Sequence, residues 1–395
     1  AGARWSDPGG GPLQWSLQTE VNQFVHADAD RIQGSRAHLL GQIALPLGDA
    51  GWRLTPRLSL NSAAYQTDRP MSDGRRRAHR TIPGFSVDSA WTLERETAAF
   101  GRALVQTLEP RLLYALTPWR DQSALPDFDS AALDFNATTV FSDNIFSGID
   151  RVSDANQVTA GLTTRYLDRA SGAELARFGI AQRYLLRDQR ITADGVPLSN
   201  RFSDLLLQAS IGVVPDWTLD TSVQFNPDTD RLVRTITSAR WSPGPLRTLY
   251  ASHRLKRGSS EQLALGWQWP LADLGRPLVG LLGSRAAPAA SSAGDCRGRV
   301  YGVGALDYSL RDRRLSGAIV GFEYDAGCWI GRVVARRQST SAQNASTQLM
   351  LQLELVGLSR LSAGSNPLSI LKDNIPGYQL LRDPRGATAD NSGAP

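Results

Sequence analysis

The side chains between Trp217 and Asn226 alternate almost strictly between two kinds, and this alternation limits the possible fold more than any other feature of the sequence. One set is mostly apolar and the other is polar: Trp217, Leu219, Thr221, Val223, Phe225 against Thr218, Asp220, Ser222, Gln224, Asn226. Successive side chains of a β-strand point to opposite faces, so the pattern predicts a strand with one apolar and one wet face. The alternation recurs in Pro83 to Glu94 and in Gln348 to Leu355.

Segments with looser alternation are spread along the rest of the chain. They are Leu13 to Val25, Ala37 to Leu47, Trp52 to Ala64, Arg102 to Leu116, Gln157 to Asp168, Ala176 to Leu186, Ser203 to Val214, Leu232 to Trp241, Leu246 to Leu255, Gln262 to Pro270, Val300 to Leu310, Leu315 to Tyr324 and Trp329 to Arg337. With ambiguous segments such as Leu133 to Phe141, we expect about 16 to 19 strands of roughly 10 residues, the length of a tilted strand that crosses a bilayer. No stretch approaches the roughly 18 consecutive apolar residues of a membrane-spanning helix.

A soluble β-sandwich or propeller also alternates, but three features favour a transmembrane barrel. The expected strands exceed the usual length of about 5 or 6 residues. Short turns alternate with long polar connections: Thr67 to Arg80, Pro118 to Ala131, Ser142 to Asn156, Arg187 to Arg201 and Ala286 to Arg299. Tryptophans lie at strand ends, as in interfacial belts: Trp15, Trp52, Trp91, Trp119, Trp217, Trp241, Trp267, Trp269 and Trp329. The predicted fold is therefore all-β, a transmembrane antiparallel β-barrel.

The positive charge of the chain is carried almost wholly by arginine. The net charge is +5, and Lys256 and Lys372 are the only lysines. The arginines are scattered and form no basic arm or stripe, so we expect no nucleic-acid partner. Because a guanidinium group matches phosphate bidentately, the same arginines are compatible with anionic lipid head groups.

The inventory of reactive residues argues against an enzyme. The most suggestive spacing is HADAD at His26 to Asp30, where alternate residues would share one face of a strand, but it has no accompanying nucleophile, and a solvated strand end is favoured. Asp127, Asp129 and Asp134 cluster in and near one connection, where a plain polar loop is favoured over a divalent-cation site. Without HxxxH, HExxH or paired CxxC motifs, we expect no metal and no cofactor.

Several long motifs occur in the order typical of one family. They are LEPRLLYALTPWRDQSALPDFDS at Leu108 to Ser130, FSGIDRVSDANQVTAGLTTRYLD at Phe146 to Asp168, YSLRDRR at Tyr308 to Arg314, EYDAGCWIGRVVARR at Glu323 to Arg337, LQLELVGLSR at Leu351 to Arg360 and NIPGY at Asn374 to Tyr378. From about Leu13 to Tyr378, the chain resembles the barrel of the LPS-assembly protein LptD family of Gram-negative outer membranes.

The resemblance implies an architecture larger than this sequence. In that family a periplasmic β-jellyroll precedes a barrel of about 26 strands. An LptE-type lipoprotein sits in the lumen as a plug, and periplasmic bridge proteins deliver lipopolysaccharide (LPS) to the N-terminal domain. We therefore expect residues 1–360 to be the C-terminal portion of the barrel and residues 361–395 a C-terminal tail. The first residues contain no signal peptide, and the jellyroll and first strands are expected to lie outside this sequence.

The resemblance also implies where LPS leaves the barrel. In the family it exits sideways between the first and last strands. The segment Gln348 to Leu358 matches the last strand, so the alternating residues Leu349, Leu351, Leu353 and Leu355 are the candidate lateral-gate strand.

Glu109 and Arg111 share a face of the predicted strand Arg102 to Leu116, opposite Leu108 and Leu112. They are candidate lumenal polar residues. One interpretation is that they contact the plug or the lipid, and the other is an ion pair that stabilises the lumen wall. The sequence leaves both open.

The two cysteines depart from the family pattern. Well-studied members carry an adjacent pair near the C-terminus that bonds to cysteines of the N-terminal domain, whereas here Gly327 precedes a lone Cys328. Cys296 lies in an inserted-looking segment. A local Cys296–Cys328 disulfide and a bond from Cys328 to an N-terminal cysteine both remain open.

The function that the resemblance implies is insertion of LPS into the outer leaflet of the outer membrane. The chain has no phosphate-binding loop, so the energy for transport would come from elsewhere. The alternative is a porin or substrate-specific channel. An outer-membrane hydrolase is disfavoured because no triad or dyad can be assembled from the residue inventory.

Overall fold

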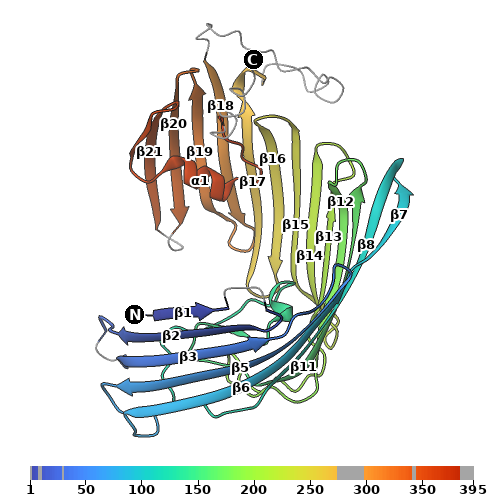
Figure 1. Cartoon of the computed structure of the whole chain (residues 1–395). Coiled ribbons are helices and arrows are strands. Elements are labelled where there is room, and N and C mark those ends of the chain that lie inside the picture. Colours follow the sequence, from blue (N-terminus) through green and yellow to red (C-terminus); the bar gives the residue numbers. More distant parts are fainter. Residues whose placement is uncertain (1, 8–10, 29–30, 274–297, 340–343, 383–395) are drawn as a thin grey trace, which may run out of the picture. The chain divides into compact units, whose positions relative to one another are not determined.

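The computed structural model describes residues 2–7, 11–28, 31–273, 298–339 and 344–382 (Figure 1). Within these ranges the chain is almost entirely β-strand, with two short 3₁₀ helices and one α-helix. Twenty strands belong to one antiparallel sheet, and β9 and β10 pair separately. The all-β prediction of long antiparallel strands is confirmed. Among the described residues, no helix has the length and apolarity needed to cross a membrane.

Two compact units divide the chain. The first comprises residues 1–209 and 223–232, and the second comprises residues 210–222 and 233–395. The first unit contains β1 (Gly2–Ser6), β2 (Gln14–Phe24), β3 (Gly34–Ala44), β4 (Leu47–Gly48), β5 (Trp52–Thr67), β6 (Arg77–Trp91), β7 (Leu93–Ala99), β8 (Arg102–Thr117), β9 (Ala131–Ala132), η1 (Thr139–Phe141), β10 (Phe146–Ser147), β11 (Ala155–Asp168) and β12 (Glu174–Leu185). Its main strands pair antiparallel in the order β1, β2, β3, β5, β6, β8, β11, β12.

Three strands contribute residues to both units: β13 (Leu205–Ile211), β14 (Trp217–Asn226) and β15 (Arg231–Gly244). The remainder of the second unit is β16 (Arg247–Lys256), β17 (Ser260–Pro270), η2 (Leu271–Asp273), β18 (Arg299–Ser309), β19 (Arg314–Asp325), β20 (Trp329–Ser339), β21 (Ala345–Leu355), β22 (Ser359–Ala363) and α1 (Pro367–Asn374). Strands β15 to β22 pair antiparallel in sequence order.

Each unit has one apolar and one largely polar face. In β21 the alternation is nearly complete, since Leu349 is 66% exposed and its neighbour Met350 is 1% exposed. The first unit exposes apolar side chains on one face in the same way: Leu58, Leu60, Phe85, Leu108, Leu112, Leu116, Leu162, Phe178 and Ile180. We call the exposed apolar face of each unit its outer face and the opposite face its inner face. This division is that of a β-barrel in lipid.

A row of indole rings lies at one end of three strands in the second unit. Trp217 of β14 stacks on Trp241 of β15 with ring centroids 5.9 Å apart, and Trp241 packs on Trp269 of β17 at 5.7 Å. All three tryptophans were expected at strand ends. Such a row is typical of the aromatic belt at a membrane boundary.

The ambiguous segment Leu133 to Phe141 is not a strand, although the main sheet of the described residues has 20 strands against the expected 16 to 19. The Oδ1 atom of Asn136 accepts hydrogen bonds from the backbone N–H groups of Thr138 and Thr139, at 2.9 and 3.1 Å. The chain then closes into η1. An asparagine side chain that bonds to nearby backbone groups competes with a strand ladder, and here it prevails.

The predicted strand around Pro83 to Glu94 is interrupted. It divides at Thr92 into β6 and β7, both of which pair with β8. Between the register pairs Ala90–Arg111 and Leu93–Leu108 lies Pro110, which has no N–H to donate to the ladder. The interruption follows from that proline.

Candidate functional site

Glu109 and Arg111 lie on the inner face of β8, as their spacing predicted. The guanidinium group of Arg111 donates to both carboxylate oxygens of Asp88 on β6, with Nε–Oδ1 at 3.0 Å and Nη2–Oδ2 at 2.7 Å. Glu109 accepts a hydrogen bond from Thr107 at 2.8 Å and lies 3.3 Å from Nε of Arg165 on β11. The two predicted residues thus belong to separate ion pairs, each linking β8 to a neighbouring strand.

A polar cavity of about 490 Å³ opens beside these pairs on the inner face of the first unit. Its lining includes Arg53, Glu109, Arg111, Arg165 and the ring of Phe141. The guanidinium carbon of Arg111 lies 4.3 Å from the centroid of that ring, a cation–π distance. The cavity therefore mixes both signs of charge with one aromatic wall.

The connection between β8 and β11, residues 118–154, is an ordered loop that lies on the inner face. We call it the inserted loop. Arg36 of β3 fixes one part of it, because this buried guanidinium group pairs at 2.8 Å with Asp129 and with Asp150 of the loop, and also at 2.8 Å with Glu20 of β2. Asp150 in turn accepts the backbone N–H of Phe128 at 2.6 Å. Three carboxylates converge on one buried cation, which satisfies the requirement that buried charges be paired.

A second set of contacts fixes the other part of the inserted loop. Arg183 of β12, also buried, donates to the carbonyl oxygen of Val140 at 2.7 Å, and the hydroxyl of Thr159 on β11 donates to the same oxygen at 3.2 Å. Val140 is completely buried in a small apolar cluster. The other members of the cluster are Ala181, Leu206, Phe135 and Phe141. Arg80 of β6 additionally donates to the carbonyl oxygen of Ile149.

A glycine makes room for the loop on β11. A Cβ atom at Gly161 would lie 2.6 Å from Cζ of Phe141. Only a residue without a side chain permits this approach of the ring to the strand. The docking of the loop therefore depends on pairs of residues that lie far apart in the sequence, such as Phe141 and Gly161.

Electrostatics within the inserted loop favour an ionised Asp129. Partial burial alone would raise the pKa of its carboxyl group, but the hydrogen bond and charge of Arg36, together with the backbone N–H of Ile149, outweigh burial and lower the pKa to about 2. This carboxylate was one of three considered for a cation site. Asp127 lies 3.7 Å from Nε of Arg151, and among the described residues no group of three acidic, histidine or cysteine side chains has metal-binding geometry.

The described part of the HADAD segment, residues 26–28, follows the end of β2 and contains a bend. Its first residue, His26, lies just after β2 and accepts the backbone N–H of Asp28 on Nδ1 at 2.9 Å. Asp30 lies outside the described residues.

The candidate gate residues lie on the outer face of β21. Leu349, Leu351, Leu353 and Leu355 are all exposed. The predicted last strand ends at Leu355, and one further strand, β22, follows it and pairs from Leu351–Ala363 to Leu355–Ser359. The edge of β21 is therefore covered over its second half.

Cys328 is exposed and unpaired in the turn between β19 and β20, directly after Gly327, whose φ is +90°. Cys296 lies outside the described residues. The disulfide candidates stay predictions.

The sequence did not single out the arginines that hold the inserted loop. Arg36, Arg80 and Arg183 lie in three different strands, and only the fold brings them to one loop. The signal that was available is the motif FSGIDRVSDANQ, since it contains Asp150 and includes the C-terminal part of the loop.

Long antiparallel strands with an apolar outer face and a polar inner face that carries an ordered loop define an outer-membrane β-barrel protein. The family model "LPS transport system D" matches residues 3–274, and the chain belongs to this family. This confirms the resemblance and the location in the outer membrane.

Relatives agree over almost the whole chain. The LPS-assembly protein LptD of Albidiferax ferrireducens is 46% identical over 377 residues, which cover 94% of this chain and 46% of that protein. The LPS-assembly protein LptD of Paracidovorax citrulli is 47% identical over 385 residues, 95% of this chain and 45% of the relative. The LPS-assembly protein LptD of Bordetella pertussis is 35% identical, and the match covers 97% of this chain and 49% of that protein. The chain thus spans about half the length of the curated relatives it matches.

Proposed function

We propose that this chain forms part of an outer-membrane transporter that inserts LPS into the outer leaflet through a lateral gate at the C-terminal end of its sheet. The observation that carries the proposal is the difference between two seams. Strands β20 and β21 are joined by 11 residue pairs, whereas β21 and β22 are joined by five. A short seam opens at lower free-energy cost because fewer backbone hydrogen bonds are broken in hydrocarbon.

The proposed partners follow from the family. They are LPS itself, an LptE-type lipoprotein plug, the surrounding outer-membrane lipids, and periplasmic bridge proteins that act through an N-terminal domain. The arginines of the inner face suit the phosphates of LPS. No enzymatic step and no cofactor enter the proposal. We assign residues 1–360 to the barrel and residues 361–395 to the tail, with the boundary falling inside β22.

The second candidate is a porin or substrate-specific channel. The polar cavity beside Arg111 favours it, because such a lining solvates small hydrophilic solutes. Two outcomes separate the candidates: depletion of a transporter lowers surface LPS and the transporter copurifies with a lipoprotein, whereas depletion of a porin changes solute uptake alone.

The gate is tested by locking the seam in the full-length protein. Cysteines at Leu353 or Leu355, cross-linked to the first strand of the complete barrel, are expected to block LPS export. Because β22 lies between these two positions and the outer edge, cysteines at Leu349 of β21 or Leu361 of β22 are better placed to reach the first strand. Surface LPS is measured before and after reduction of the cross-link.

A matched control locks a seam that is already fully paired. Phe322 of β19 and Val333 of β20 are exposed register partners on the outer face, and a disulfide between cysteines at these positions is expected to leave export unchanged. Normal export with the gate seam locked would refute lateral exit at this edge.

A further inference from the structure

The segment Asn366–Arg382 crosses the inner face of the second unit, and we call it the strap. It begins with α1, whose N-cap Asn366 accepts the backbone N–H of Leu368 at 3.1 Å and whose first turn carries Pro367. Beyond α1, the strap turns at Ile375, where the N–H of Tyr378 donates to the carbonyl oxygen of Ile375 at 3.0 Å. The strap is thus an ordered element with its own start and turn.

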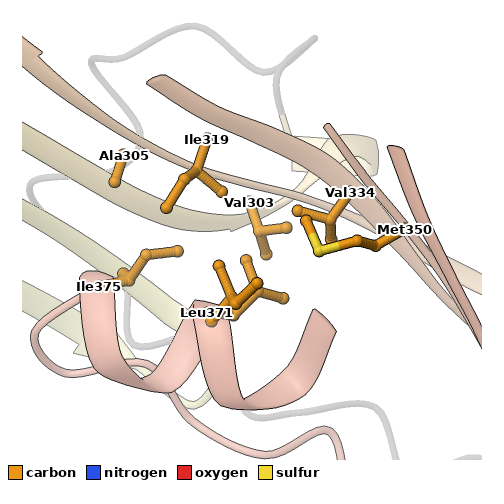
Figure 2. Close-up of a cluster of buried hydrophobic side chains, with 8 residues drawn as sticks. Val303, Ala305, Ile319, Val334, Met350, Leu371 and Ile375 are labelled. Atoms are coloured by element: carbon orange, nitrogen blue, oxygen red, sulfur yellow. The ribbon is translucent and has the colours of Figure 1, made fainter. Parts of the chain in front are cut away.

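An apolar cluster holds the strap to the sheet. Figure 2 shows Leu371 and Ile375 pointing from the strap toward side chains of β18 to β21. The sheet residues of this cluster are Val303, Ala305, Ile319, Val334 and Met350. Leu371 is 0% exposed and Met350 is 1% exposed. Burial of this kind contributes roughly 1.5–3 kcal/mol for each large side chain.

Polar contacts extend the strap to β17. Gln379 and Gln268 exchange two hydrogen bonds between side chain and backbone, at 2.8 and 2.9 Å. The side chain of Gln379 also accepts the backbone N–H of Leu246, at the start of β16, at 2.7 Å. The strap therefore contacts the sheet from β16 to β21.

A row of one tyrosine and four charged side chains runs from the strap to the terminal strand. The Tyr378 hydroxyl donates to Oε1 of Glu323 at 2.6 Å, and Nε of Arg332 donates to the same oxygen at 2.8 Å. Arg332 also donates to Glu354 at 2.7 Å, and Glu354 accepts Nε of Arg360 on β22 at 2.9 Å. We call Tyr378, Glu323, Arg332, Glu354 and Arg360 the relay.

The middle of the relay is out of reach of water. Glu323 is 0% exposed and Arg332 at most 2% exposed. A second connection to the strap strengthens this middle part, because Arg332 donates to Gln352 at 3.2 Å and Gln352 donates to Asn366 at 3.1 Å. Removing one member of such a network affects the others, since their hydrogen bonds polarise and position one another.

The strand at the far end of the relay, β22, is short, and within the described residues β21 is the strand that it pairs with. All five residues of β22 are exposed, and its hydrogen bonds to β21 span five residue pairs. A short two-stranded edge is marginally stable by itself. The ion pair of Arg360 with Glu354, its register partner on β21, adds a side-chain contact to this short ladder.

We propose that the strap is a latch that keeps β22 paired with β21 through the relay, so that release of the strap frees the terminal edge of the sheet. The latch deepens the proposed function and rests on it in one respect, namely that this edge borders the lateral gate. A strap bound across β16 to β21 keeps these strands as one rigid panel, and only the last strand depends on the relay.

The latch is tested by hydrogen exchange of β22 in the full-length protein with its lipoprotein partner in lipid nanodiscs, without added LPS. Tyr378→Phe removes one hydroxyl and keeps the ring, and Arg360→Gln acts at the exposed end of the relay. Each is expected to speed amide exchange in residues 359–363 about tenfold, equivalent to about 1.4 kcal/mol. The double variant is expected to add little to either single variant, because both break the same chain of contacts.

The control is Arg382→Gln. Arg382 belongs to the strap and lies 3.4 Å from Asp325, but neither residue is part of the relay. In this variant the amide exchange rate of residues 359–363 is expected to stay within about twofold of the parent's rate. Exchange in β11 of the first unit reports whether each variant is folded.

A second strap variant covers the case in which Tyr378→Phe fails to fold. If Tyr378→Phe reduces folded protein, Gln379→Ala replaces it, because it loosens the strap without touching the relay and is expected to speed β22 exchange. Unchanged exchange in the strap variant and in Arg360→Gln overturns the latch, whatever the export rate. Faster exchange with normal LPS export supports the latch and contradicts exit at this edge.

Discussion

Arg36 is a buried cation that joins two strands to the inserted loop. Its three carboxylate partners are Glu20, Asp129 and Asp150, so its removal leaves Asp150, which is 0% exposed, without its cation. Breaking a buried pair from one side typically costs about 3–5 kcal/mol, far more than the pair contributes relative to apolar packing. The residue therefore stabilises the part of the inserted loop around Asp129 and Asp150 on the inner face.

Replacement of Arg36 by glutamine is expected to loosen the part of the inserted loop around Asp129 and Asp150, which are the loop residues that Arg36 binds. Limited proteolysis of the folded protein should then cut within this segment, whereas the parent is expected to resist cleavage there. The control is Arg75→Gln, because Arg75 pairs with Asp73 at 2.6 Å but is 70% exposed. An exposed pair contributes about 0–1 kcal/mol, so this variant should resist cleavage like the parent. Equal resistance in both variants would show that the loop is held without Arg36.

The pH dependence of the loop follows from the lowered pKa of Asp129, about 2 when folded against about 3.9 for an ordinary aspartate. A group whose pKa is depressed by folding contributes stability that is fully present above its unfolded pKa and is lost as the pH falls through its folded pKa. The loop is therefore expected to stay docked down to about pH 4 and to loosen between about pH 4 and pH 2. Cleavage of the loop by pepsin at a series of pH values measures this loosening. In the Asp129→Asn variant, the difference in cleavage between about pH 4 and pH 2 should be smaller than in the parent.

At the scale of elements, the strands were predictable and their interruptions were not. The strand Trp217–Asn226 has the bounds that alternation predicted, because one lipid-facing side imposes a period of two on every residue. The break at Thr92 was missed, since it depends on Pro110 in the neighbouring strand. A pattern read along one segment contains no information about what lies across the ladder.

The candidate site divides in the same way. Glu109 and Arg111 were placed correctly on one face by their spacing, but their partners Asp88 and Arg165 come from other strands. The inserted loop was expected only as a polar connection. Its docking depends on contacts over long sequence separations, such as Arg36 with Asp150, that single-segment patterns cannot supply.

Gly161 gives a test of docking at the level of one strand. Gly161→Ala is expected to displace Phe141 and destabilise the docked loop by about 1–3 kcal/mol, because the added Cβ meets a packed ring. Gly179→Ala is the control, since its Cβ would have only ordinary contacts, at 3.6 Å from Thr163. Thermal unfolding and loop proteolysis measure both. Equal unfolding temperatures and equal cleavage of the loop in the two variants would argue against close packing of Phe141 on Gly161.

At the scale of the whole molecule, the disulfide partner of Cys328 is open, because both candidate partners lie outside the described residues. Cys328 is exposed, so it is accessible to a partner thiol. In the full-length protein we expect Cys328 to react with a maleimide only after reduction. Non-reducing peptide mapping then identifies its partner as Cys296 or an N-terminal cysteine. A thiol that reacts before reduction would contradict both pairings.

The tryptophan row of β14, β15 and β17 has a consequence for the depth of the protein in lipid. From Trp217 to Asn226 the strand has 10 residues, which span roughly 33 Å at about 3.3 Å per residue. An outer-membrane barrel carries an apolar band about 25 Å tall, and a strand tilted by about 40° covers that height with this length. The indole rings then mark one boundary of the hydrocarbon layer, and the turn after Asn226 marks the other.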